Sequence, residues 1–203
     1  MEKNVAAVLL VARGEVGVKE SGGNNYGPKV KAYLASVGLD EGEPWCAAYV
    51  SWVLRKAGVK EWHHTGDTWA IEDWAREKGI LHKQDPKPGD VFLLLGANGR
   101  PTHTGIVAST GTFRKKGRFD TYEGNIGGPS DTDGDGVYNK ARDASSCLFV
   151  RWADLPANKT LPLAVRYDGK EILCVPRAED GKTRCDLRPL VEALGFTLKV
   201  SVG

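Results

Sequence analysis

Cys46 is the residue of this sequence whose type and position best suit nucleophilic chemistry. It follows Pro44-Trp45 at the expected start of a helix that runs to Gly58. The free N–H groups and the dipole at a helix start favour anions, so they favour a thiolate there. The alternative is a buried cysteine that packs as a small apolar side chain.

A base and an orienting group could complete a catalytic set with this thiol. His103 stands at the head of the predicted strand 104–108, where a rigid strand end can fix an imidazole. Glu123 ends the predicted strand 119–123, and its carboxylate could accept a hydrogen bond from the imidazole. Asn125 could do the same as a neutral partner. Together they supply the base and orienting group that a cysteine nucleophile requires, although each residue alone could be structural.

The elements expected around these residues form an α+β domain. Helices are predicted first and strands afterwards, which favours N-terminal helices packed on a mainly antiparallel sheet. The predicted helices cover 2–13, 30–37, the stretch from Pro44 to Gly58, and 68–78, and the predicted strands cover 90–95, 104–108, 119–123 and 147–151.

A second, smaller domain is expected at the C-terminus, with the boundary between 1–155 and 156–203. Two Asp-Gly pairs, at 168–169 and 180–181, predict hairpins, and a helix over 187–194 and a last strand follow. A ββαβ module of this size is small for independent stability, so we expect it to pack on the first domain or on a second copy as a homodimer.

Composition excludes several classes of protein. The 203 residues carry a net charge of +2, which argues against a nucleic-acid binder. The apolar run from Val5 to Ala12 is too short to span a membrane and lacks a cleavage site, so we expect no membrane insertion and synthesis in the cytoplasm without a signal peptide. Cys174 and Cys185 flank one predicted turn, but their spacing does not establish a disulfide.

Several motifs resemble one family. The segment Glu43-Pro-Trp-Cys-Ala-Ala-Tyr-Val-Ser-Trp-Val53 is similar to the nucleophile helix of CHAP amidases in the NlpC/P60 superfamily. Gly89-Asp-Val-Phe92 and His103-Thr-Gly-Ile-Val107 resemble that family's central strands, and Glu123-Gly-Asn125 resembles its acidic motif. The entry segment 14–25 is similar to that of a phage-endolysin-like subgroup. The resemblance covers about residues 10–152.

This resemblance implies a papain-like fold and a peptidoglycan hydrolase. Cys46 would be the nucleophile, His103 the base and Glu123 the orienting group, with Asn125 as an additional partner. The bond cut would be an amide of the bacterial cell wall, through a thioester, after release of the enzyme by host lysis or export. Amidase and endopeptidase activity both fit. The alternatives are a cysteine peptidase or acyltransferase on another amide, and a non-catalytic wall-binding protein.

Other residues are candidates for binding. Trp45 and Trp69 could stack on sugar or peptide, although most tryptophans belong to the core. Asp131, Asp133 and Asp135 imitate the start of a calcium-binding EF-hand loop, but Arg142 stands where its last carboxylate is expected, so a plain turn is the alternative. No cofactor is required for the proposed chemistry.

The tail from Val165 to Gly195 resembles the stalk-type repeat at the N-terminus of copper amine oxidases. The resemblance implies wall targeting or dimer formation, and it does not imply copper. A simple structural cap is the alternative.

Overall fold

The structure is a computed structural model. It describes residues 5–111, 117–127 and 134–155, and the backbone of four strands between 163 and 185. The chain divides into two compact units, Met1–Leu155 and Pro156–Gly203, which are described separately. Among the described residues, no helix combines the length and apolar character needed to cross a bilayer.

Four helices precede the sheet in the first unit, as the sequence predicts. They are α1 (Val5–Gly14), α2 (Pro28–Ala35), α3 (Cys46–Lys56) and α4 (Thr68–Glu77). Pro28 occupies the first turn of α2, where its missing N–H costs nothing. The Asp67 side chain caps α4 by accepting a hydrogen bond from the backbone N–H of Trp69 at 2.8 Å. These local signals set the helix boundaries.

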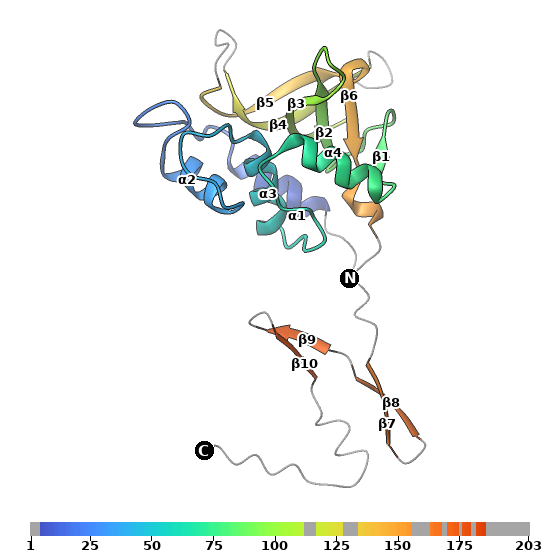
Figure 1. The fold of residues 1–203 in the computed structure, drawn as a ribbon. Coiled ribbons are helices and arrows are strands. Elements are labelled where there is room, and N and C mark those ends of the chain that lie inside the picture. The colour runs from blue at the N-terminus through green and yellow to red at the C-terminus, as the bar shows by residue number, and fades with distance from the viewer. Residues whose placement is uncertain are drawn as a thin grey trace. The chain divides into compact units, whose positions relative to one another are not determined.

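The sheet contains six antiparallel strands in the order β1-β6-β2-β3-β4-β5, and the helices lie against it (Figure 1). The strands are β1 (Leu81–His82), β2 (Val91–Leu95), β3 (Pro101–Ser109), β4 (Arg118–Ile126), β5 (Gly136–Asp143) and β6 (Cys147–Val150). Gly99 has φ 74° in the turn between β2 and β3. This left-handed conformation suits glycine in a tight turn.

Sequence patterns missed β5, which pairs with β4 along most of its length. It is the edge strand, and Lys140, Arg142 and Asp143 make it too polar for a pattern of core residues. The short strand β1 was also unpredicted. Otherwise the observed fold confirms the expected class, with helices and an antiparallel sheet.

Alternating residues of the central strands face two separate apolar clusters. Val91, Leu93 and Ile106 pack with the helices in the larger one. Phe92 and Val107 belong to the smaller cluster, whose other members are Phe119, Cys147 and Phe149. The second cluster lies on the face of β3 that His103, Gly105 and Val107 share.

In the second unit, β7 (Leu163–Tyr167) pairs with β8 (Lys170–Cys174), and β9 (Pro176–Glu179) pairs with β10 (Lys182–Cys185). Both pairs are antiparallel and flank the two Asp-Gly positions, as predicted. The helix expected over 187–194 and the last strand lie outside the described residues.

Candidate active site

Cys46 is the first residue of α3 and is largely buried, with 8% of its surface exposed. Eight of the eleven residues of α3 are buried, so packing against the core stabilises the helix. Trp45 at the N-cap has no acceptor for the first N–H groups, and no side-chain cap bond is made there. The helix start therefore keeps donors for an anionic group near the sulfur.

His103 links this sulfur to a carboxylate. Its Nε2 lies 2.8 Å from Oε2 of Glu123. Cys46 lies close enough to the imidazole to raise its pKa, as Glu123 does. Because Nε2 faces Glu123, Nδ1 is the nitrogen left for the sulfur. Burial by itself lowers the pKa of His103, but Cys46 and Glu123 outweigh it and raise that pKa to about 9. At neutral pH the ring is therefore an imidazolium.

The Glu123 carboxylate is fully buried and surrounded by donors. Arg142 on β5 donates from Nε to Oε1 at 2.7 Å and from a terminal nitrogen to Oε2. The Thr121 hydroxyl donates to Oε1 at 2.5 Å. Burial would raise the pKa of Glu123, but Arg142 and His103 lower it to about 2. The carboxylate therefore stays ionised and can stabilise the imidazolium.

Two glycines allow this close arrangement. A Cβ at Gly105 would lie 2.7 Å from the carbonyl oxygen of Tyr122 and 2.8 Å from Cγ of Glu123. A Cβ at Gly124 would lie 2.6 Å from the ring of Tyr49 on α3. Gly105 therefore leaves room for Glu123 beside β3, and Gly124 lets α3 approach β4.

Cys147 is the other free cysteine among the described residues. Burial raises the pKa of its thiol to about 12, although Arg142 opposes the shift. Its Sγ donates to the backbone oxygen of Asp143 at 3.4 Å. Cys147 is thus a protonated core thiol at neutral pH, which leaves Cys46 as the candidate nucleophile.

The role of Asn125 as an additional partner of the imidazole stays a prediction. Among described residues, the side chains bonded to the Glu123 carboxylate are those of His103, Arg142 and Thr121. Asn125 lies against Gly134, where a Cβ would be 2.4 Å from its Oδ1. Sequence reasoning missed Arg142 and Thr121, because Arg142 lies on the unpredicted strand β5.

The two candidate tryptophans differ in exposure. Trp45 is fully buried, stacks on Tyr33 with ring centroids 5.5 Å apart, and donates to Glu20 at 2.8 Å. Its ring is therefore part of the core, because no face is open to a substrate. Trp69 is 47% exposed, and its Nε1 donates to the backbone oxygen of Pro101 at 3.0 Å. This bond ties the exposed ring to Pro101, which precedes His103 by two residues on β3.

The expected calcium loop lies largely outside the described residues, since Asp131 and Asp133 fall there. The Asp135 carboxylate already accepts hydrogen bonds from Lys19 at 2.5 Å and from the Tyr138 hydroxyl at 2.6 Å. Within the described part of the chain, no three His, Cys, Asp or Glu residues gather in a way that could hold a metal ion. Calcium binding by this loop stays a prediction.

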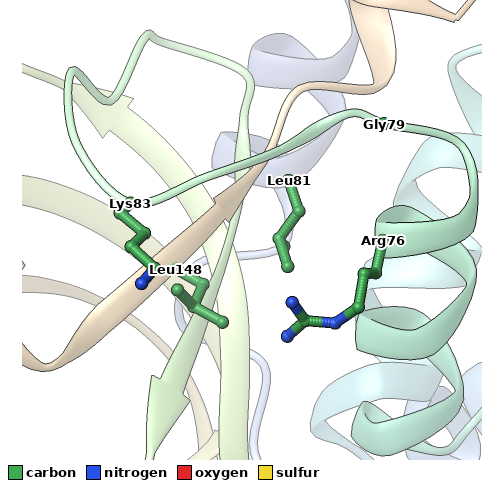
Figure 2. Close-up of a pocket in the computed structure, with 5 residues that line it drawn as sticks. All are labelled: Arg76, Gly79, Leu81, Lys83 and Leu148. Atoms are coloured by element: carbon green, nitrogen blue, oxygen red, sulfur yellow. The ribbon is translucent and has the colours of Figure 1, made fainter.

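A pocket elsewhere in the unit has a different character. It lies between α4 and strands β1 and β6, where Arg76 and Lys83 flank Leu81 and Leu148 (Figure 2). Its lining holds two cations and no nucleophile. The arrangement suited to chemistry is therefore the Cys46–His103–Glu123 set.

Comparison with known proteins finds one matching family model. Residues 38–125 match the CHAP domain. The CHAP match contains Cys46, His103 and Glu123, and it ends before Arg142. No curated protein matches the chain in sequence.

Among solved structures, the endolysin LysIME-EF1 is 19% identical, with a TM-score of 0.50, and the match covers 97% of this chain and 88% of that one. The NlpC/p60 domain of the peptidoglycan hydrolase SagA is 20% identical, with a TM-score of 0.40, over 73% of this chain and 98% of that one. At this identity, the likeness to the endolysin shows a shared fold. The CHAP match ends before the second unit, so the resemblance of 165–195 to a stalk-type repeat stays a prediction.

Proposed function

We propose that this protein is a peptidoglycan hydrolase of endolysin type, which cleaves an amide bond of the bacterial cell wall with Cys46 as its nucleophile. The observation that carries the proposal is the contact of His103 Nε2 with the buried Glu123 carboxylate at 2.8 Å, together with the influence of Cys46 on the pKa of His103. The CHAP match and the fold shared with an endolysin support peptidoglycan as the substrate.

The first half of the reaction forms a thioester. The Cys46 thiolate attacks the carbonyl carbon of the scissile amide, and the electron pair of the C=O bond moves to oxygen. The backbone N–H groups at the start of α3 stabilise the resulting oxyanion. The His103 imidazolium then gives its proton to the leaving nitrogen as the C–N bond breaks.

The second half returns the enzyme to its starting state. His103, now neutral, takes a proton from water, and the resulting hydroxide adds to the thioester carbon. The C–S bond breaks, and the carboxylic acid leaves with the thiolate restored beside the imidazolium. Glu123 remains ionised throughout and keeps the imidazole in place.

Trp69 is the proposed contact for sugar or peptide. Arg100 lies 4.7 Å from the centre of its ring, and the guanidinium is itself held by Asp73 at 2.8 Å. The held ring offers a flat apolar surface near the start of β3, which suits stacking on a sugar or peptide. Residues 156–203 are proposed to direct the enzyme to the wall, with dimer formation as the alternative role.

A turbidity assay on purified cell walls tests the proposal. The whole wild-type chain should lyse the walls, and Cys46→Ala should remove lysis without changing the unfolding temperature by more than a few degrees. Cys147→Ala is the matched control, and it should keep lytic activity. Lysis by Cys46→Ala at the wild-type rate would refute the nucleophile.

Mass analysis of the released fragments then identifies the bond. A free stem peptide indicates an amidase, and a cut within the stem or cross-bridge indicates an endopeptidase. Walls bound but left uncut by the wild type would instead support a wall-binding protein.

A further inference from the structure

Arg142 is the charged residue nearest the proposed catalytic set that neither the sequence motifs nor the CHAP match includes. It lies on the edge strand β5, and its guanidinium donates to both oxygens of Glu123. A two-point contact of this kind fixes the plane of the carboxylate as well as its position. The Oε2 atom that Arg142 binds is the one that faces His103.

We propose that Arg142 is a positioning residue, which keeps the Glu123 carboxylate ionised and aimed at His103. The inference rests on the proposed function, in which His103 must be an imidazolium beside Cys46. Among the described residues no hydrogen bond joins Arg142 to either of those two residues, and the contact that links it to them is the one with Glu123.

The surroundings of Glu123 show why one cation is needed there. Three side chains bond the carboxylate: His103 on β3, Thr121 on β4 and Arg142 on β5. Tyr49 on α3 and Cys147 on β6 lie within electrostatic range of it. Tyr49 and Cys147 are neutral at physiological pH, because burial raises the pKa of each. His103 and Arg142 are therefore the two cations that compensate this buried charge.

Loss of Arg142 would have a definite chemical consequence. The pKa of Glu123 would rise, since burial alone favours its neutral form. A neutral or rotated carboxyl group stabilises the imidazolium less. With less imidazolium beside it, the Cys46 sulfur should react more slowly near neutral pH.

Alkylation of Cys46 by iodoacetamide measures this effect without any wall substrate. The alkylation rate is measured on the whole chain over a range of pH. Mass spectrometry of the Cys46 peptide distinguishes alkylation of Cys46 from alkylation of the other thiols. Arg142→Gln should slow alkylation near neutral pH by about tenfold, which is the effect of losing about one pKa unit of stabilisation of the imidazolium.

Lys140→Gln is the matched control. Lys140 lies two residues before Arg142, on the same face of β5, and its Nζ is 5.3 Å from the centre of the Tyr138 ring. Its loss removes the same charge from the same strand, and the alkylation profile should stay unchanged. An equal effect of both substitutions would show a general charge effect and overturn the proposal.

A double-mutant cycle with Glu123→Gln supplies the decisive comparison. If Arg142 acts through Glu123, adding Arg142→Gln to Glu123→Gln should change the alkylation rate by less than about twofold. The same loss of alkylation rate in the wild-type and Glu123→Gln backgrounds would overturn the proposal.

Should Arg142→Gln fold poorly, Arg142→Lys keeps the charge but not the two-point contact, and an intermediate alkylation rate is expected. A wild-type rate in Arg142→Lys would overturn the positioning role.

The two proposals can fail separately. If the wild type does not lyse walls while Arg142→Gln slows alkylation, the function is wrong and the role of Arg142 stands. If the wild type lyses walls and Arg142→Gln alkylates like the wild type, the role of Arg142 is wrong and the function stands.

Discussion

Gly105 leaves the space that the Glu123 side chain fills, since a Cβ at Gly105 would lie 2.8 Å from Glu123 Cγ. The same Cβ would also meet the ring of Phe92 at 2.7 Å and the backbone oxygen of Tyr122 at 2.7 Å. Backbone of a paired strand cannot turn away as a flexible side chain can. The absence of a side chain on β3 is thus part of how the carboxylate reaches His103.

Gly105→Ala should therefore lower both stability and activity. The extra methyl group should destabilise the unit by about 1–3 kcal/mol, the usual cost of overpacking, and should displace Glu123. Chemical unfolding and wall lysis measure the two effects. Gly111→Ala is the control, because its Cβ would meet nothing within 4 Å. A Gly105→Ala variant as stable and active as the control would contradict this account of the packing.

The rate of wall lysis should fall on the alkaline side as pH passes about 9, where His103 loses its proton. The leaving nitrogen needs that proton, so the imidazolium is the active form in thioester formation. Initial rates measured from pH 6 to 10 at constant ionic strength give the profile. An alkaline limb centred near the ordinary histidine value of 6.5 would show that Cys46 and Glu123 do not raise the pKa of His103.

The interaction between His103 and Glu123 should make the free energy of unfolding depend on pH. The pKa of His103 is raised to about 9, so its contribution is complete below about 6.5 and is lost as pH rises to 9. The pKa of Glu123 is lowered to about 2, so its contribution is complete above about 4.5 and is lost as pH falls to 2. Because the two groups share one interaction, the change at either end should be on the order of 1–3 kcal/mol.

Denaturant unfolding at several pH values tests this dependence. His103→Gln should lose most of the decline between pH 6.5 and 9, since its side chain does not titrate. An unchanged alkaline decline in His103→Gln would assign that decline to other groups.

Asp90 and Arg151 form a second buried ion pair, which joins the start of β2 to the end of β6. Two nitrogens of Arg151 lie 3.1 and 3.3 Å from the Asp90 oxygens. Asp90→Ala should destabilise the first unit by about 3 kcal/mol, because it leaves a buried guanidinium without its charge partner. Tryptophan fluorescence reports on this unit, since all six tryptophans lie between residues 45 and 152.

Glu77→Ala is the control for that prediction. Its carboxylate pairs with Lys78 on the surface, where water screens the charges and the pair contributes little to stability. Equal losses in Asp90→Ala and Glu77→Ala would mean that the buried pair does not hold the two strands together.

The sequence by itself determined the elements and the candidate chemistry. Helix α3 is evident from its apolar spacing, its Pro44 start and its Gly58 stop, all of which act within one segment. The same local signals place Cys46 at a helix start and His103 and Glu123 on strands. Local patterns thus identify which residues could react and which element carries each.

Only the tertiary structure decided which neighbours surround those residues. Arg142 reaches Glu123 because β5 pairs with β4, and an exposed edge strand carries no apolar pattern from which that pairing could be read. Burial was decided in the same way: Trp45 is enclosed by Tyr33 and Trp69 remains exposed, although both are tryptophans beside predicted helices. Contacts between segments distant in the chain depend on packing, and local sequence does not encode packing directly.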